Sequence, residues 1–218
     1  MSGLIEAVVF DLDGILVQSE ELWDAARREL AAEHDVDWPD DATDAMMGMS
    51  SKEWSRYVHD EVGVPDPPEE INRRVLEWVE ERYRTDLPWI KGAQDAVRRM
   101  AAAFPLGLAT SSNREIIDLV VEVGGFEDLF EVTVSSEEVE RGKPAPDVYL
   151  EAAKRMGVDP ARTAAVEDST NGLLAAHNAG MRVIAIPNDA HPPAQRGLDV
   201  ADVVLNSIED LTAGVVMG

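Results

Sequence analysis

The chain has 218 residues, of which 45% are hydrophobic, and 19 lysine and arginine residues against 43 aspartate and glutamate residues give a net charge of −24. This composition suits a globular protein with a sizeable core. It excludes a transmembrane protein, because no apolar run approaches the ~18 residues of a membrane span, and it opposes binding to nucleic acid, whose phosphates need basic partners. The absence of cysteine excludes disulfides, thiolate catalysis and cysteine-bound zinc. The N-terminal residues lack the pattern of a secretory leader, so we expect a cytoplasmic protein.

The first apolar run, Glu6–Asp11, predicts a strand, and the segment after it, from about Gln18 to Asp86, has helical patterns and no strand pattern. We expect helices over Glu20–Glu33, Asp41–Met47, Ser50–Glu61 and Glu69–Arg84. Four of the five tryptophans lie here and the fifth, Trp89, lies at the exit, as expected if a small helical domain fills its own core with large side chains. We therefore predict an inserted all-helical domain at residues 17–86, with residues 1–16 and 87–218 forming the main domain.

Strands and helices alternate over the rest of the chain. Further apolar runs predict strands at Leu106–Thr110, Val132–Ser135, Thr163–Glu167 and Arg182–Ile186. Between these runs, the spacing from Ser112 to Glu115 predicts a capping box, and Gly180 suits the end of a helix that starts at Thr170. The alternation predicts an α/β fold with a Rossmann-like, open, mainly parallel sheet and right-handed crossovers.

Two carboxylates follow the first strand. Asp11 and Asp13 are two residues apart, so both side chains can project to one side beyond the carboxyl end of the strand, where ligands of open α/β sheets bind. A similar pair, Asp35 and Asp37, lies in the helical segment, and we expect it to be solvated surface.

Three later strand ends carry polar residues that would meet this first pair. They are Thr110-Ser111-Ser112, Gly142-Lys143-Pro144 and Glu167-Asp168-Ser169. Taken singly, each has a plainer interpretation, as a helix cap at Ser112, Asp168 or Ser169 or as a solvated lysine in a turn. Together they predict oxygen ligands for Mg²⁺, a carboxylate nucleophile, a second carboxyl for proton transfer, and a hydroxyl and an ammonium group for a phosphoryl group. The histidines at positions 34, 59, 177 and 191 lack the spacing of metal ligands, and we expect surface or packing roles for them.

The stretches around these residues resemble the four motifs of the haloacid dehalogenase superfamily. They read Asp11-Leu-Asp-Gly-Ile-Leu, Thr110-Ser-Ser, Gly142-Lys-Pro-Ala-Pro-Asp-Val-Tyr149 and Val166-Glu-Asp-Ser-Thr-Asn-Gly172. They occur in the family's order along the whole chain, and the second aspartate of the first motif indicates the phosphatase branch. A helical cap inserted directly after that motif resembles the subfamily of beta-phosphoglucomutase, phosphoglycolate phosphatase and small sugar-phosphate phosphatases.

The resemblance implies a Mg²⁺-dependent phosphomonoesterase. In it, Asp11 attacks phosphorus to form an aspartyl-phosphate, and Asp13 protonates the leaving oxygen and later activates water. The Mg²⁺ ion is held by the Asp11 carboxylate, the backbone carbonyl of Asp13 and Asp168.

The resemblance also implies how the phosphoryl group is bound. The Thr110 side chain and the backbone N–H of Ser111 donate hydrogen bonds to its oxygens. Lys143 neutralises charge between Asp11, the phosphoryl group and Glu167.

The inserted cap should select the substrate. Ser51 and Lys52 lie where capped members of the family place a specificity loop, so they are candidates for contacting the leaving group. The alternative is that Ser50 caps the next helix and Lys52 is solvated. We expect the methionines at positions 46, 47 and 49 to pack in the cap.

The chain departs from the pattern of the mutases. Gln18-Ser19 stands in place of an Asp-Thr pair, Trp23 in place of a histidine, and Ser51 in place of a cap arginine, which removes the expected binder of a second phosphate. The stretch Ser19-Glu-x-Leu-Trp23 resembles sugar and polyol phosphate phosphatases. We therefore expect hydrolysis of a small phosphorylated sugar or polyol by a monomer or weak dimer. The alternatives are a beta-phosphoglucomutase-like mutase, a non-catalytic phosphometabolite-binding protein, and a scaffold whose acidic surface recruits a basic partner.

Overall fold

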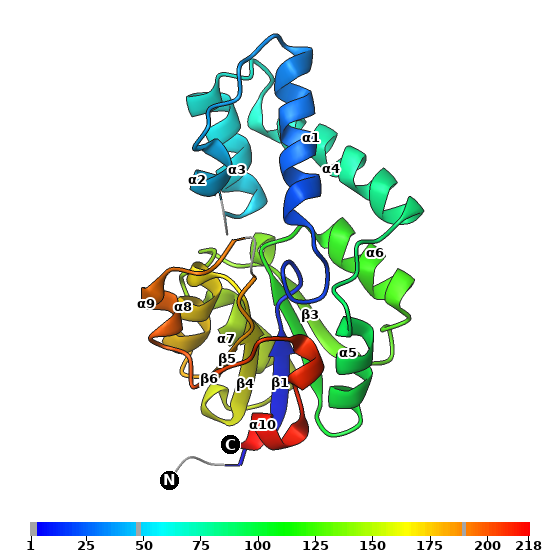
Figure 1. The fold of residues 1–218 in the computed structure, drawn as a ribbon, viewed down its shortest axis with the longest axis vertical. Helices are drawn as coiled ribbons and strands as arrows, with labels where there is room; N and C mark the ends of the chain where they lie inside the picture. The colour runs from blue at the N-terminus through cyan, green and yellow to red at the C-terminus, as the bar shows by residue number, and fades with distance from the viewer. Residues whose placement is uncertain (1–3, 47–48, 189–190) are drawn as a thin grey trace.

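A computed structural model describes residues 4–46, 49–188 and 191–218 (Figure 1). Its centre is a sheet of six parallel strands in the order β3-β2-β1-β4-β5-β6. In chain order the strands are Ala7–Phe10, Leu106–Thr110, Phe130–Ser135, Thr163–Glu167, Arg182–Ala185 and Val203–Val204. The five predicted strands and the predicted fold class are confirmed. The two-residue edge strand β6 was not predicted, because so short a run gives no sequence pattern.

The sheet is buried on both faces, which explains the continuous apolar runs. Along β1, Val8 and Phe10 pack on one face and Val9 packs on the other. Helices α5 (Ala93–Ala101) and α6 (Arg114–Gly124) cover the first face, and α7 (Asp147–Met156) and α8 (Thr170–Asn178) cover the second. Two short helices, α9 (Gln195–Leu198) and α10 (Ala213–Met217), complete the C-terminal part. Among the described residues, no helix combines the length and apolar character needed to cross a bilayer.

The segment between β1 and α5 is helical and lies beyond the carboxyl ends of the strands (Figure 1). Its helices are α1 (Glu20–Glu33), α2 (Ala42–Met46), α3 (Ser51–Tyr57), which continues as a π-helical turn to Val62, and α4 (Pro68–Thr85). These positions agree with the predicted helices, except that Met47 lies outside the described residues.

The tryptophans of the helical segment divide into two groups. Trp23 and Trp54 are buried, and their rings meet edge to face at 6.0 Å, whereas Trp38 and Trp78 are only partly buried. Trp89 packs on Phe126 of the main domain at 5.6 Å. The buried residues of the segment also form one continuous cluster with the sheet face under α5 and α6. The expectation of a separate core in this segment was therefore wrong, because α4 packs directly on α6.

The chain passes into and out of the helical segment through two paired stretches. The N–H of Gln18 donates to the carbonyl of Pro88 at 2.8 Å, and the N–H of Ile90 donates to the carbonyl of Leu16 at 2.9 Å. Val17 and Trp89 form an antiparallel bridge between these two bonds. This pairing supports our proposal that residues 17–86 form a cap on a main domain of residues 1–16 and 87–218.

The N-termini of α6 and α8 show that neither Ser112 nor Asp168 is used to cap a helix. Helix α6 begins at Arg114 after Asn113, so the capping box predicted from Ser112 was wrong. In α8 the cap is Ser169, whose hydroxyl accepts a hydrogen bond from the N–H of Gly172 at 3.0 Å. The Asp168 carboxylate is therefore not used in capping.

Candidate active site

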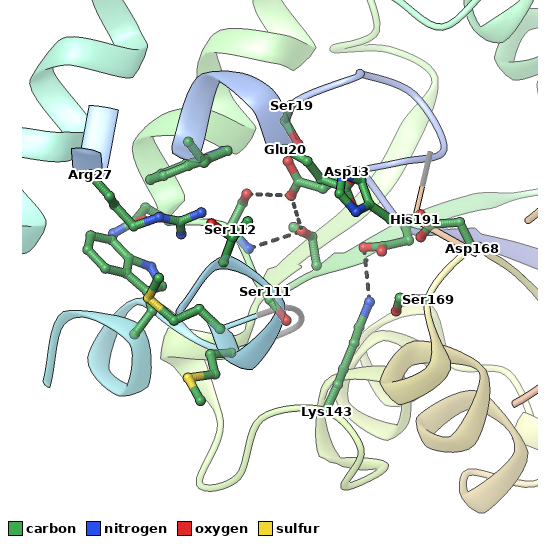
Figure 2. A pocket seen from close by; sticks show the side chains of 18 residues that line it. Asp13, Ser19, Glu20, Arg27, Ser111, Ser112, Lys143, Asp168, Ser169 and His191 are labelled. Atoms are coloured by element: carbon green, nitrogen blue, oxygen red, sulfur yellow. Dashed lines mark hydrogen bonds and ion pairs between the residues drawn. The ribbon is translucent and has the colours of Figure 1, made fainter. Parts of the chain in front are cut away.

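A cavity lies between the carboxyl edge of the sheet and the helical segment (Figure 2). Residues from the four predicted strand ends line it together: Asp11, Asp13, Thr110, Ser111, Lys143 and Asp168. The parallel strands β1, β2 and β4 end side by side, which brings residues more than 150 positions apart in sequence to one place. The structure thus brings together the residues that the sequence singled out at these ends.

Lys143 is the charged centre of this cavity. Its ammonium group lies 2.9 Å from Asp11 Oδ1, donates to Glu167 Oε1 at 2.6 Å, and donates to the carbonyl of Ala109 at 3.3 Å. Its side chain is buried, whereas the three other lysines of the chain are exposed. Burial alone would lower the pKa of Lys143, but the two carboxylates outweigh burial and raise this pKa above its ordinary value. The ammonium group therefore stays charged at neutral pH.

Glu167 holds Lys143 in place and has its own oxygens fully engaged. Oε1 accepts hydrogen bonds from Lys143 and from the Tyr149 hydroxyl at 2.9 Å, and Oε2 accepts from the backbone N–H groups of Asp168 at 3.0 Å and Ser169 at 3.1 Å. Tyr149 was not predicted as part of the site. Burial, with the charges of Glu167 and Asp11, raises its pKa, so it remains a phenol that donates to Glu167.

Three buried carboxyl groups gather around this single ammonium group. Oxygens of Asp11, Glu167 and Asp168 lie within 4.8 Å of one another. Burial, followed by the charge of Glu167, raises the pKa of Asp11 and of Asp168 well above its ordinary value. A divalent cation would remove this penalty, and carboxylate oxygens are its preferred ligands. Because Glu167 is already engaged, Asp11 and Asp168 are the carboxylates that fit such an ion.

The loop after β1 passes very close to Asp168, one of the two aspartates that would hold the cation. Gly14 has a φ of 77°, and a Cβ atom at this position would lie 1.9 Å from Asp168 Oδ2. Only glycine therefore lets the backbone that follows Asp13 approach Asp168 so closely.

Asp13 is oriented by two hydroxyl groups, one from the last residue of β2 and one from the loop that follows it. Its Oδ2 atom accepts hydrogen bonds from Ser112 Oγ at 2.6 Å and from Thr110 Oγ1 at 3.3 Å (Figure 2). Ser112 thus positions Asp13 instead of capping α6. Its own N–H donates to Thr110 Oγ1 at 3.0 Å. The other oxygen of Asp13, Oδ1, is buried and has no hydrogen-bond partner among the described residues.

Ser51 and Lys52 do not line the cavity. The Ser51 side chain is buried and its hydroxyl donates to the Glu137 carboxylate of the main domain, while Lys52 is exposed. Helix α3 begins just after Ser50, whose N–H donates to Glu53 at 2.8 Å. This geometry favours the alternative of a capped helix and a solvated lysine, and a role of Ser51 and Lys52 in binding substrate stays a prediction.

Met46 and Met49 belong to the packing of the helical segment and also line the cavity. Met46 is buried, as expected for a packing residue. Met47 lies outside the described residues.

Several other residues of the cavity were not identified from the sequence. Arg27 of α1 is the most unexpected, because its side chain is 9% exposed yet carries a guanidinium group. It follows Trp23 by four residues and precedes Leu30 by three, so it lies in the buried stripe of α1. A charged residue in a buried stripe is the signal that could have found it. Glu20 and His191 also line the cavity, with 3.6 Å between Glu20 Oε2 and His191 Nε2.

Comparisons with known proteins agree with this geometry. Residues 8–186 match the family described as haloacid dehalogenase-like hydrolase. Hexitol phosphatase B of Escherichia coli (strain K12) is 34% identical over 98% of this chain and 97% of its own length. The phosphorylated carbohydrates phosphatase of Thermotoga maritima is 30% identical over 83% of this chain and 84% of its own length.

Solved structures with a similar fold include complexes with phosphate and with a sugar bisphosphate. The structure of CbbY from Rhodobacter sphaeroides in complex with phosphate has a TM-score of 0.85 and 28% sequence identity, and the match covers 98% of this chain and 99% of that one. A mutant of the same CbbY in complex with xylulose-(1,5)bisphosphate has a TM-score of 0.86. With the buried carboxylates and lysine at the strand ends, these likenesses lead to one conclusion. The chain belongs to the haloacid dehalogenase-like hydrolases and is a phosphatase of that family.

Proposed function

We propose that the protein is a Mg²⁺-dependent phosphomonoesterase that hydrolyses a sugar or polyol phosphate through an aspartyl-phosphate intermediate. The observation that carries the proposal is the placement of Lys143, which lies 2.9 Å from Asp11 inside a buried group of carboxylates. Similarity to hexitol phosphatase B over nearly the whole chain supports the substrate class.

Asp11 is the proposed nucleophile. Its carboxylate attacks phosphorus, the bond to the leaving oxygen breaks, and Asp13 gives that oxygen a proton. Asp13 is then a carboxylate and takes a proton from the water molecule that cleaves the aspartyl-phosphate. The hydrogen bond from Ser112 keeps Asp13 in one orientation through both steps, so the Thr110 hydroxyl can donate to the phosphoryl group once substrate is bound.

Charge balance decides whether the first step can occur. Two unit negative charges ~4 Å apart repel by about 4 kcal/mol at an effective dielectric constant of ~20. Lys143 opposes this repulsion, and the Thr110 side chain and the Ser111 N–H would bind the phosphoryl oxygens. Bound Mg²⁺ would supply further positive charge, and Asp11, Asp168 and the backbone carbonyl of Asp13 are the groups that would hold it.

The direct test is release of inorganic phosphate from p-nitrophenyl phosphate and from a panel of sugar and polyol phosphates. We expect turnover with Mg²⁺ that EDTA abolishes and that added Mg²⁺ restores. A chain that bound sugar phosphates but released no phosphate under any of these conditions would instead be a binding protein, and the proposal would be wrong.

A phosphosugar mutase is the second candidate, and one observation keeps it open. The cavity does contain a cap arginine, Arg27, although not at the position of Ser51. Beta-glucose 1-phosphate with a trace of the 1,6-bisphosphate separates the two activities. We expect more inorganic phosphate than glucose 6-phosphate, and the reverse ratio would establish the mutase.

The remaining features of the proposal follow from composition. With a net charge of −24 and no cysteine, we propose a cytoplasmic enzyme of small metabolites that binds no nucleic acid. We further propose that it acts as a monomer or weak dimer. Sedimentation of the purified chain at several concentrations would test the oligomeric state.

A further inference from the structure

Arg27 places a positive charge on the wall of the cavity that faces the catalytic groups. It comes from α1 in the helical segment, and its guanidinium group points into the cavity (Figure 2). Its side chain is about nine-tenths buried. Lys143 lies at the carboxyl edge of the sheet against Asp11 and Glu167, so the cavity has cationic groups on two separate walls.

The guanidinium group of Arg27 has no direct ion-pair partner within the described part of the chain. No hydrogen bond or ion pair joins it to another described residue, and its buried Nε atom has no partner. Asp24, whose charge favours the charged form of Arg27, is engaged by Arg28 at 2.5 Å and by the Thr43 hydroxyl. The contact that remains is with the ring of Trp54, 5.6 Å from the guanidinium carbon.

This arrangement is costly unless a ligand completes it. A buried charge without an ion-pair partner is strongly unfavourable. The chain has 43 acidic residues that could have paired with Arg27, yet none does so among the described residues. Arg73 of α4, by comparison, contacts both Glu70 and Glu77. Burial lowers the pKa of Arg27 to about 10, so the group is still charged at neutral pH.

The neighbouring walls favour an anion over a neutral polar group. Trp23, Trp54, Met46 and Met49 line the same cavity and offer no carboxylate that would compete for the guanidinium group. A largely apolar surrounding strengthens the attraction between opposite charges. A planar guanidinium group also matches a carboxylate or phosphate in two parallel hydrogen bonds.

We infer that Arg27 binds a second oxyanion of the substrate, at the end remote from the phosphoryl group that is hydrolysed. This inference rests on the proposed phosphatase function and narrows its substrate class to sugar or polyol phosphates that carry a further carboxylate or phosphate. Arg27 is then a specificity residue that touches the leaving group, and Lys143 serves the phosphoryl group.

Four compounds test the inference. Glucitol 6-phosphate has no second oxyanion, 6-phosphogluconate has a carboxylate, fructose 1,6-bisphosphate has a second phosphate, and p-nitrophenyl phosphate reports on the chemical step alone. We expect kcat/KM to be at least ten-fold higher for one of the two compounds that carry a second oxyanion than for glucitol 6-phosphate. The preferred compound identifies the oxyanion as carboxylate or phosphate.

Variants assign that preference to Arg27. Arg27→Gln should lower kcat/KM for the preferred compound by about 10- to 100-fold, chiefly through KM, and change p-nitrophenyl phosphate turnover less than three-fold. Arg27→Lys, which keeps the charge, should restore part of the loss. Arg73→Gln, at an exposed position of α4, is the matched control and should change neither value. Titration calorimetry of an Asp11→Asn protein, with and without Arg27→Gln, should show the same loss in binding without turnover.

The outcomes separate this inference from the proposed function. If p-nitrophenyl phosphate is hydrolysed but glucitol 6-phosphate is the better substrate, or if Arg27→Gln affects every compound equally, the role of Arg27 is wrong and the phosphatase stands. If no compound is hydrolysed with Mg²⁺, the proposed function fails first. A melting temperature of Arg27→Gln equal to or above that of the wild type shows that the losses do not come from unfolding.

Discussion

Replacing Asp11 by asparagine should abolish catalysis and at the same time stabilise the metal-free fold. The side chain keeps its shape but loses its charge. In the metal-free protein, the oxygens of Asp11 lie within 4.8 Å of those of Glu167 and Asp168, so each pair of charges repels by at least about 3.5 kcal/mol at an effective dielectric constant of ~20. Attraction between Asp11 and Lys143 at 2.9 Å stabilises the charged pair by about 6 kcal/mol at the same dielectric constant. Burial adds a further cost, and the combined result is a raised pKa of Asp11.

The raised pKa fixes the direction of the pH dependence. Between its ordinary value of 3.8 and its higher value in the fold, Asp11 binds more protons in the folded state than in the unfolded state. The free energy of unfolding of the wild type therefore falls as the pH rises through this interval. The Asp11→Asn variant has no carboxyl group at this position, so its stability does not fall for this reason. We expect a gain of about 1.4 kcal/mol for each unit of pKa removed, and each kcal/mol raises the melting temperature by ~2 to 4 °C in a chain of this size. The gain should disappear below about pH 4.

Two assays examine the two halves of this prediction. Phosphate release should fall by at least about 10³-fold, which corresponds to ~4 kcal/mol of barrier. Thermal melts in EDTA at pH 7 and at pH 4 should give the pH-dependent gain in stability. A variant that keeps more than about a tenth of wild-type turnover would show that Asp11 is not the nucleophile. A melting temperature several degrees below that of the wild type in EDTA would refute the electrostatic reasoning.

Three further predictions concern the metal, an ion-pair network and salt. Millimolar Mg²⁺ should raise the melting temperature of the wild type, and Asp168→Asn should lose most of this shift; an equal shift in both would contradict the assigned ligands. Burial raises the pKa of Glu138, but hydrogen bonds from the Ser135 N–H and from Arg114 and Arg155 outweigh burial and lower this pKa to about 2. Its stabilisation is therefore present above pH 4.5 and is lost as the pH falls toward 2, so Glu138→Gln should cost about 1 to 2 kcal/mol at pH 7 and progressively less in acid, as urea titrations would measure. Residues 17–85 carry a net charge of −11. Screening from 0.05 to 2 M KCl should thus leave the melting temperature constant or higher and KM constant or lower, and a steady fall in melting temperature would contradict this.

The sequence predicts the catalytic end of the cavity better than the cap end. Asp11 and Asp168 directly follow strands with unambiguous apolar runs, and parallel strands bring their carboxyl ends together whatever the helices do. Arg27 and Tyr149 are members of helices, and their position relative to the cavity depends on how those helices pack. The prediction for Ser112 was wrong for a related reason. Its spacing to Glu115 is that of a capping box, but α6 starts two residues after Ser112, and the Ser112 hydroxyl donates a hydrogen bond to Asp13 instead.

The pairing of Gln18 with Pro88 and of Ile90 with Leu16 has a consequence for the entropy of the chain. Strands β1 and β2 are neighbours in the sheet although Val8 pairs with Leu106, so a long loop must close before the centre of the sheet can form. The paired stretches fasten the ends of that loop at its base. Closing a flexible loop of twice the length costs only ~0.6 kcal/mol more. Helical segments of very different size and lining could therefore be exchanged above the same strands with little penalty to the sheet, so the choice of substrate can diverge while the phosphoryl chemistry stays fixed.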